Sequence, residues 1–208
     1  SKPAPVSLSP VEADDVPALL RVHTAAFKTD QFSNLMLLNR DEDAHQEVMG
    51  RSIRRWMSDP DAKLTRALDA DGRLVGWSCW VVKAGYEEEP APAREPAPAP
   101  AARRAETGQD DPARALGGLM FRDMTWWEGK HLGGKRHAVL QALATDPRCQ
   151  RRGVATELVR HGLEEVDSQG LPCWIHASPA SHQLYVKAGF REVGRSDYDL
   201  DEWAPGGK

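Results

Sequence analysis

A short run of residues between two apolar stretches carries the strongest chemical pattern in the chain. The run is Gln150-Arg151-Arg152-Gly153-Val154-Ala155. Gly153 has no side chain and Ala155 almost none, so a ligand can approach the backbone here. Amide N–H groups at a helix start have no helical partner, and with the helix dipole they favour an anion. Arg151 and Arg152 add charge suited to phosphate. The run predicts a pyrophosphate-binding turn, although a basic turn with a helix-entry glycine has the same residues.

This run differs from the best-known phosphate loops. It lacks the lysine and the spacing of a Walker A loop, and it does not follow the G-x-G-x-x-G pattern. The type of ligand must therefore be argued from the elements around it.

The flanking elements must hold this turn between a strand and a helix. Residues 138–145 are almost continuously apolar, as in a strand buried on both faces. Asp146-Pro147 ends that strand, and residues 154–166 place apolar side chains on one side of a helix. Residues 172–177 form a second buried strand, and Ser178-Pro179 begins a helix that ends at Ala188. A strand–helix–strand order predicts a parallel pair with a right-handed crossover.

Two segments resemble motifs of one enzyme superfamily. Residues 143–155 resemble motif A of the GCN5-related N-acetyltransferase (GNAT) superfamily, with its core Gln/Arg-x-x-Gly-x-Gly/Ala. Leu184-Tyr185-Val186-Lys187-Ala188-Gly189-Phe190 resembles motif B, written Leu-Tyr-x-x-x-Gly-Phe. The motifs stand in the expected order, about 30 residues apart, and the resemblance is good over 138–193. A Pro/Ala-rich insert before motif A looks most like fungal members.

The resemblance implies a fold and a cofactor. The fold is α/β (α+β): a mixed, mostly antiparallel twisted sheet with helices on both faces. Strands 138–145 and 172–177 would splay apart and bind acetyl-CoA between them. The strand backbone would pair with the pantetheine arm, and the amides of 151–156 would hold the pyrophosphate. The cofactor-binding residues implied are Leu143, Ala144, Thr145, Gln150, Arg151, Arg152, Gly153, Val154, Ala155 and Thr156, with His182 as a further candidate.

Acyl transfer to an amine needs an oxyanion donor, a proton donor for the leaving thiolate, and a base. A backbone N–H of the first strand would serve the oxyanion. Tyr185, a phenol with a pKa of about 10, would protonate the thiolate. His176 is the best candidate for the base, because Gln141 is the one polar interior residue that strand 138–145 offers. A core tyrosine and a hydrogen-bonded core histidine remain the alternatives, and Asp30 and Glu42 are weaker candidates for the base.

The acceptor site is less clearly encoded. Phe27, Asp30 and Phe32 lie in or beside the loop expected between the first two helices, a region that often lines the acceptor site in this superfamily. Trp77 and Trp80 are three residues apart on a strand, so they point to opposite faces. We expect one to face the acceptor cleft and the other the core, while core packing is the alternative for both.

The remaining elements follow from periodicity and turn signals. We expect a strand at 6–8, a helix from Ser9-Pro10 to Phe27 and a second helix at 42–57. Strands at 63–68 and 73–82 would form a hairpin at Asp69-Ala70-Asp71-Gly72, and 119–127 would be helical. The whole chain, 1–208, is expected to be a single domain with a flexible Pro/Ala/Glu-rich insert at about 84–112.

Composition excludes several classes of protein. The chain has 208 residues, a net charge of -4 and a pI of about 6.0, so nothing indicates a nucleic-acid partner. Seven acids and three arginines give segment 84–112 a charge of -4, which leaves the remainder nearly neutral. No apolar run reaches the roughly 18 residues of a membrane span. Three cysteines predict free thiols in the cytoplasm, without a metal site. A monomer or a homodimer is expected.

The function predicted is transfer of an acetyl group from acetyl-CoA to the primary amine of a small molecule, such as a xenobiotic, an antibiotic or a metabolite. The nearly neutral body offers no strongly acidic groove for a lysine-rich peptide, which favours the small amine. Two alternatives stay open: a protein or peptide N-acetyltransferase, and a non-catalytic acyl-CoA-binding module. A nucleotide-binding or scaffold protein built around the insert fits the motif poorly.

Overall fold

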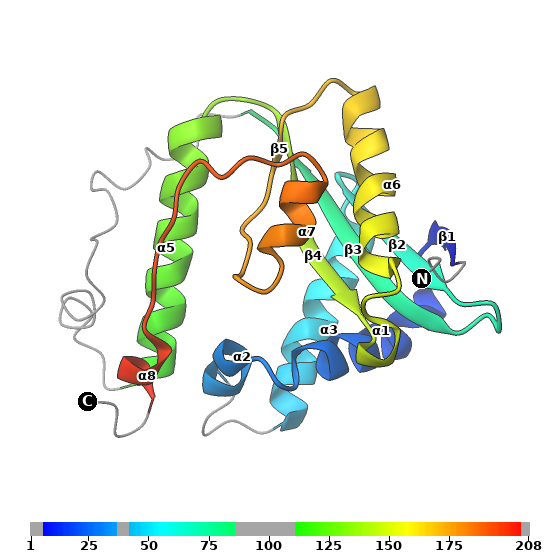
Figure 1. Ribbon diagram of the computed structural model, residues 1–208, viewed down its shortest axis with the longest axis horizontal. Coiled ribbons are helices and arrows are strands. Elements are labelled where there is room, and N and C mark those ends of the chain that lie inside the picture. The colour runs from blue at the N-terminus through cyan, green and yellow to red at the C-terminus, as the bar shows by residue number, and fades with distance from the viewer. Residues whose placement is uncertain (1–5, 37–41, 86–110, 205–208) are drawn as a thin grey trace. The chain divides into compact units, whose positions relative to one another are not determined.

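A computed structural model describes residues 6–36, 42–85 and 111–204 (Figure 1). The chain divides into two compact units. The first, here the sheet unit, comprises Ser1–Lys28, Glu42–Ala84 and Arg136–Arg191. The second, the helical unit, comprises Thr29–Asp41, Gly85–Lys135 and Glu192–Lys208. Most of the insert predicted at 84–112 falls in 86–110, outside the described residues.

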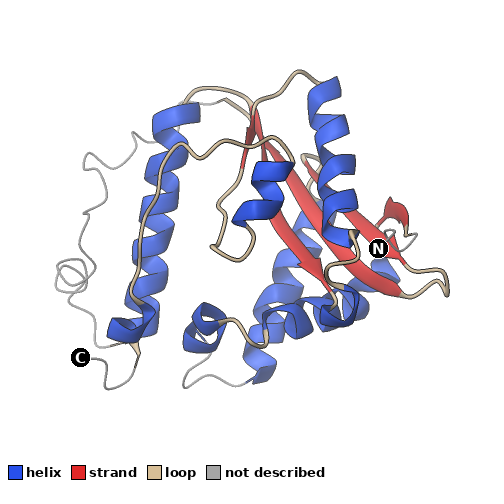
Figure 2. Cartoon of the chain, in the orientation of Figure 1, coloured by secondary structure: helices blue, strands red, loops and turns tan. Residues whose placement is uncertain are grey.

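The sheet unit is built on five strands in the order β1-β2-β3-β4-β5 (Figure 2). The first four are antiparallel neighbours, and β4 and β5 are parallel. This mixed, mostly antiparallel sheet confirms the fold class predicted from the sequence. The strands are β1 (Ser7–Pro10), β2 (Ala62–Leu68), β3 (Leu74–Lys83), β4 (His137–Thr145) and β5 (Cys173–Trp174).

Helices pack on both faces of the sheet because β3 is apolar on both sides. Trp77 lies in one core cluster with residues of α1 (Val16–Phe27) and α3 (Glu42–Ser58), and its indole N–H donates to Leu19 O at 3.1 Å. Trp80 lies in another cluster, against α6 (Val154–Ser168). The two side chains point to opposite faces, as their spacing predicts.

The pairing between β4 and its neighbours changes along the strand. On one side, β3 pairs with β4 from Lys83↔His137 to Gly76↔Thr145. A bulge interrupts this ladder, because Cys79 pairs with Ala142 while Trp80 pairs with Leu140, which leaves Gln141 as the extra residue. On the other side, β5 pairs with β4 at only two positions, Ala138↔Cys173 and Val139↔Trp174. Beyond Val139, no strand in the described part of the chain pairs with this edge of β4.

Several predicted boundaries were wrong. Ser9 and Pro10 pair with β2 as the end of β1, so α1 begins only at Val16, after a short 3-10 helix η1 (Ala13–Asp15). The second buried strand is Cys173–Trp174 rather than 172–177, because β5 diverges from β4. The following helix, α7 (His182–Lys187), also starts later than predicted.

The helical unit contains α2 (Gln31–Met36), α5 (Pro112–Leu132) and α8 (Leu200–Trp203) around a core of their own. Leu35, Leu116 and Trp203 are buried in this core. The prediction at 119–127 covers only the middle of α5. The helix begins at Pro112, where the Asp111 carboxylate accepts hydrogen bonds from two backbone amides. The sequence also missed α2 and α8, since six and four residues are too few for a periodic signal.

In the described part of the chain no helix is both long and apolar enough to cross a membrane. Within the same ranges, no three His, Cys, Asp or Glu side chains gather as a set of metal ligands.

We predict that Gly162→Ala destabilises the sheet unit. A Cβ atom at this position of α6 would lie 2.1 Å from Nε1 and 2.2 Å from Cε2 of Trp80. Overpacking of this kind costs about 1–3 kcal/mol, more than the roughly 1 kcal/mol by which alanine favours a helix over glycine. Urea unfolding should show a lower midpoint.

Gly118→Ala in α5 is the matched control, because a Cβ there meets nothing within 4 Å. This variant should be as stable as the wild type or slightly more so. Equal stability of the two variants would contradict the packing of Trp80 on α6.

Candidate active site

The predicted pyrophosphate turn connects the end of β4 to the start of α6. Residues 146–153 form it, beginning with the short 3-10 helix η2 (Pro147–Cys149). Gly153 has a φ of 86° and Arg151 a φ of 61°, both in the left-handed region. This conformation costs glycine nothing, whereas it strains arginine, and together the two residues curl the backbone into a concave turn.

Helix α6 starts without a side-chain cap. The amide of Glu157 bonds to Gly153 O, so the amides of 154–156 belong to the first turn, which no helical carbonyl can reach. Most helices satisfy such groups with Ser, Thr, Asp or Asn, but the residue here is Gly153. With the exposed side chains of Arg151 and Arg152 beside it, this helix start suits a phosphate ligand.

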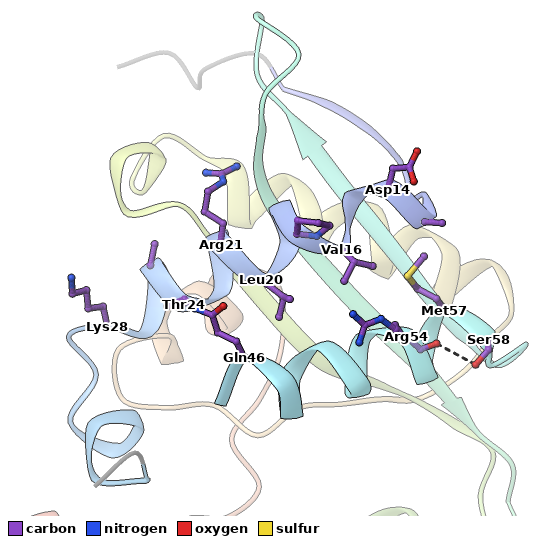
Figure 3. Close-up of a pocket in the computed structure, with 13 residues that line it drawn as sticks. Asp14, Val16, Leu20, Arg21, Thr24, Lys28, Gln46, Arg54, Met57 and Ser58 are labelled. Atoms are coloured by element: carbon purple, nitrogen blue, oxygen red, sulfur yellow. Dashed lines mark hydrogen bonds between the residues drawn. The ribbon is translucent and has the colours of Figure 1, made fainter. Parts of the chain in front are cut away.

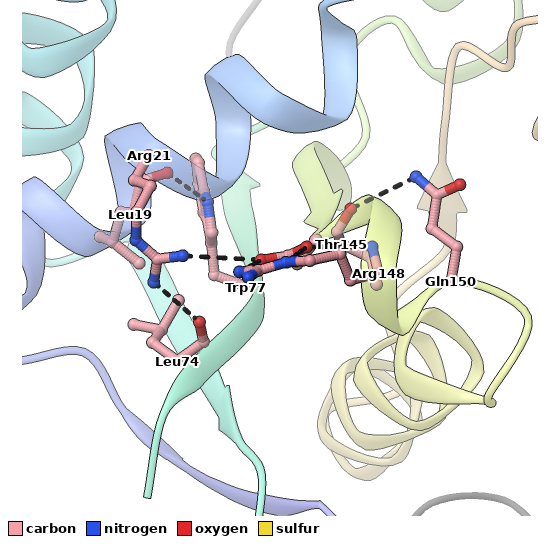
Figure 4. A network of polar contacts seen from close by, with 8 residues as sticks. Leu19, Arg21, Leu74, Trp77, Thr145, Arg148 and Gln150 are labelled. Atoms are coloured by element: carbon pink, nitrogen blue, oxygen red, sulfur yellow. Dashed lines mark hydrogen bonds and ion pairs between the residues drawn. The ribbon is translucent and has the colours of Figure 1, made fainter.

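Gln150, which the sequence predicts in the cofactor site, has a local role in the structure. Its side-chain Nε2 donates to Thr145 O at 3.3 Å, so it ties the turn to the end of β4 (Figure 4). The Thr145 hydroxyl is buried and has no hydrogen-bond partner. A buried polar atom without a partner at this position is available to a ligand.

The buried side chain of Asp146 holds the turn in place through contacts with two arginines. Its side chain is 3% exposed and accepts two hydrogen bonds from the Arg148 guanidinium, at 3.0 and 2.7 Å. Arg21 of α1 lies 3.5 Å from the same carboxylate and also donates to Leu74 O, in β3 (Figure 4). The Arg148 side-chain hydrogen bond lowers the pKa of Asp146 below its usual value, and burial opposes this. The sequence did not predict this network, because Arg21 is 125 positions away from Asp146.

The unpaired edge of β4 leads from the bulge to the turn. Leu143 is half-buried, and Ala144 and Thr145 are buried. Because β5 has already diverged, none of the described strands pairs with the backbone N–H and C=O groups on this edge. An extended ligand with amide groups, such as a pantetheine arm, fits such an edge. The predicted residues 143–145 thus lie at the end of β4, and the predicted residues 151–156 lie at the end of the turn and the start of α6.

Tyr185 lies on α7, in the core cluster on the α6 side of the sheet. It is 8% exposed, and its ring meets Phe190 edge to face with centroids 5.9 Å apart. Burial raises the pKa of the Tyr185 phenol, and a hydrogen bond with the Ser181 side chain opposes this. A phenol with a raised pKa keeps its proton at neutral pH, as a proton donor must.

His176 and His182 flank the turn between β5 and α7. His176 is exposed, so it is not a core histidine, and its Nε2 accepts a hydrogen bond from Trp174 Nε1 at 3.0 Å. His182 is half-buried at the first position of α7, where its backbone amide donates to Ser178 O. The contact between Trp174 and His176 was not predicted.

The structure corrects the view that Trp77 or Trp80 lines an open cleft. Their relative exposures are 0% and 5%, so both are core residues. Phe27 is half-buried and packs beside His23, with ring centroids 4.7 Å apart.

Asp30 and Phe32 belong to the helical unit. The Asp30 carboxylate accepts hydrogen bonds of 2.8 Å from the amide and the hydroxyl of Ser33, so it caps α2. Phe32 packs against the core of that unit. The weaker candidate Glu42 begins α3, and its side chain lies outside the described residues.

A separate groove of about 1060 Å³ lies between the outer faces of α1 and α3 (Figure 3). Val16, Leu20 and Met57 line it together with Lys28 and Arg54. It contains none of the residues predicted from the motifs, so its size does not identify it as the catalytic site.

Comparison with known families identifies the class of protein. The model of the acetyltransferase (GNAT) family matches residues 29–190. The chain belongs to the GNAT acetyltransferase family. It is also 34% identical over 90 residues to YedL, an uncharacterized N-acetyltransferase of Escherichia coli (strain K12). That match covers 36% of this chain and 57% of YedL, so it spans little more than half of the relative.

Solved structures share the fold. An aminoglycoside antibiotic 6'-N-acetyltransferase, AAC(6')-Ih of Acinetobacter baumannii, has a TM-score of 0.53 and 14% identity, over 94% of this chain and 97% of that chain. A GNAT family acetyltransferase from Brucella melitensis, in complex with acetyl-CoA, has a TM-score of 0.51 and 14% identity, over 91% and 84%. Membership of the family supports the use of acetyl-CoA or CoA.

We predict that Asp146→Asn lowers stability by about 2 kcal/mol at pH 7, because it replaces charge-assisted hydrogen bonds to Arg148. The folded-state pKa of Asp146 lies below the unfolded value of about 3.9. Its stabilisation is therefore complete above about pH 4 and is lost as the pH falls through the folded pKa. Thermal unfolding from pH 7 to pH 3 should show the wild type approaching the variant at the acid end.

Asp71→Asn serves as the control, since the Asp71 side chain is 79% exposed and its ion pair with Arg73 spans 3.7 Å. It should have no measurable effect. A constant gap between Asp146→Asn and the wild type across this pH range would contradict the assignment.

Proposed function

We propose that the chain transfers an acetyl group from acetyl-CoA to the primary amine of a small molecule. One observation carries the proposal: a glycine-led helix start without a side-chain cap follows the turn after β4, and beyond Val139 no described strand pairs with the β5-facing edge of β4. The first feature suits a pyrophosphate and the second an amide-bearing arm, which are the two parts of coenzyme A that lead to its sulfur.

The residues present fit that cofactor. The amides of 151–156 would hold the pyrophosphate, and Arg151 and Arg152 would add counter-charge. The edge of β4 at Leu143, Ala144 and Thr145 would pair with the arm. When bound, acetyl-CoA supplies a thioester that an unprotonated amine can attack and whose thiolate needs a proton as it leaves. The bulge at Gln141 turns backbone groups away from β3, and a free N–H there would serve as the oxyanion donor.

Tyr185 would donate the proton that the leaving thiolate takes up. Its raised pKa keeps the phenol protonated, and its packing against Phe190 holds the ring in place. His176 would act as the base for the acceptor amine, either directly or through a water molecule. Asp30 is the weaker candidate for a base, because its carboxylate already caps α2.

The small-molecule acceptor is supported by charge. The body of the chain outside 84–112 is nearly neutral, so it offers little attraction to a lysine-rich peptide. The Acinetobacter neighbour is named for an aminoglycoside, which is also a small amine, although its identity is only 14%. A peptide acceptor and a non-catalytic acyl-CoA-binding module are the outcomes that the test below separates from this proposal.

Other features of the proposal come from the sequence. The fungal-type layout stays a prediction, since the relatives described above are bacterial.

A cytoplasmic location accords with the three cysteines, which are all free thiols. Burial raises the pKa of Cys79 and of Cys173 to about 12, so neither is a reactive thiolate. We propose a monomer or a homodimer.

The first experiment measures CoA release from acetyl-CoA with a thiol reagent across polyamines, aminoglycosides, arylamines, amino acids and lysine peptides. Turnover with small amines is expected, whereas turnover with lysine peptides alone would overturn the small-molecule proposal. Gly153→Glu should abolish calorimetric binding of acetyl-CoA, because it places a bulky anion in the cradle.

Gly170→Glu is the matched control, since Gly170 follows the other end of α6, has a φ of 64° and has nothing within 4 Å of an added Cβ. It imposes similar backbone strain without touching the cradle. Normal binding by a folded Gly153→Glu protein would contradict the cofactor site. Binding without turnover on any amine would favour the acyl-CoA-binding module.

We further predict that Tyr185→Phe slows the chemical step by about 10²-fold, the low end of the range for general acid catalysis. The dissociation constant of acetyl-CoA should barely change, because phenylalanine keeps the packing against Phe190. Single-turnover kinetics measures the chemical step, and the melting temperature controls for folding. An unchanged single-turnover rate would exclude Tyr185 as the proton donor.

A further inference from the structure

The groove of about 1060 Å³ between the outer faces of α1 and α3 lies outside the candidate active site (Figure 3). Its apolar lining includes Val16, Pro17 and Leu20 from α1 and Met57 from α3. Val16 is buried, Leu20 and Met57 are half-buried, and Pro17 is exposed. The groove therefore has an apolar floor and is open to solvent.

The charged side chains of the groove are mostly basic. The described residues that line it include one acid, Asp14, and three cations, Arg21, Lys28 and Arg54. Arg21 is balanced by the carboxylate of Asp146, 3.5 Å away. Lys28 and Arg54 are exposed, and neither forms an ion pair within the described part of the chain. The groove is thus locally positive, although the whole chain has a net charge of -4.

The second half of α3 adds to this positive charge. Residues 48–58 contain three arginines, Arg51, Arg54 and Arg55, and no acid. Arg55 lies in the last turn of α3, where a cation interacts favourably with the helix dipole. That effect is confined to the last turn, so it does not account for Arg51 or Arg54, which lie earlier in the helix. These two arginines remain available to an anionic partner.

Arg54 brings its charge to the apolar floor. A Cβ atom added at Gly50 would lie 3.3 Å from Arg54 Nη1 and 3.6 Å from Leu20 Cδ1. The guanidinium and the leucine side chain therefore both lie against this glycine. A partner that places an apolar group on Leu20 has a cation within reach of its neighbouring side chains.

The shape of the groove suits a helix better than an enclosed small molecule. Small-molecule sites bury about 70–90% of the ligand surface, whereas most residues that line this groove are exposed. Helix α1 has 12 residues and is about 18 Å long. A second helix of similar length can lay one apolar face along such a groove and leave its other face in water.

We propose that this groove docks an acidic amphipathic helix of a partner protein. Apolar side chains of that helix, spaced three and four residues apart, lie on the floor at Leu20 and Met57. Its Asp and Glu side chains face Lys28, Arg51 and Arg54, and this charge complementarity selects an acidic helix over a basic one. The inference does not depend on the proposed function.

The test uses two fluorescein-labelled peptides of about 14 residues, long enough to span the groove as a helix. Both have leucine at the same helix-face positions, and one carries glutamate and the other lysine at the remaining positions. Fluorescence anisotropy should show binding of the glutamate peptide alone. Arg54→Glu should weaken it about tenfold. The double variant Lys28→Glu, Arg54→Glu should bind the lysine peptide instead.

Arg114→Glu is the matched control, because Arg114 is an exposed helix arginine on α5, away from the groove, and has no ion pair among the described residues. It changes the net charge by the same amount as Arg54→Glu and should bind the glutamate peptide like the wild type. The melting temperature of each variant controls for folding.

Absence of glutamate-peptide binding to the wild type, or equal weakening by Arg54→Glu and Arg114→Glu, would overturn the proposal. Arg54-dependent binding of dodecanoate or of phosphatidylserine vesicles in place of the peptide would identify a lipid as the occupant and overturn it too. A dimer in sedimentation velocity that dissociates in Arg54→Glu would identify a second copy of the chain and would likewise contradict a partner helix.

Discussion

Two parallel strands, β4 and β5, share only two residue pairs, so beyond Val139 one side of β4 has no partner among the described strands, and the candidate site depends on this divergence. Backbone N–H and C=O groups need hydrogen bonds, and β3 provides them along one side of β4 only. The bulge at Gln141 adds a second local break in the ladder. An enzyme of this family can use such an edge as a binding surface, since the groups are already oriented by the strand.

The electrostatics of the turn follow from the same stretch of chain. Asp146 would repel a phosphate bound nearby if its charge were unbalanced. Arg148 and Arg21 both approach its carboxylate, so the negative charge is compensated within the protein. Arg151, Arg152 and the first turn of α6 then remain to attract an anion. The network therefore fixes the turn and preserves its positive character.

The proposed proton donor lies on the same side of the sheet as the helix start proposed to hold the cofactor. Tyr185 belongs to the cluster on the α6 side, where the start of α6 would hold the cofactor.

The sequence by itself determined the family, the strand–helix–strand order around residues 138–188 and the opposite directions of Trp77 and Trp80. These depend on local patterns: apolar runs, a glycine at a helix start and the two-residue period of a strand. The tertiary structure decided the rest. The divergence of β5, the ion pairs of Asp146 with Arg21 and the burial of both tryptophans depend on partners distant in sequence. No local pattern records such partners, which is why Ser9-Pro10 was assigned to a helix although pairing with β2 makes it a strand.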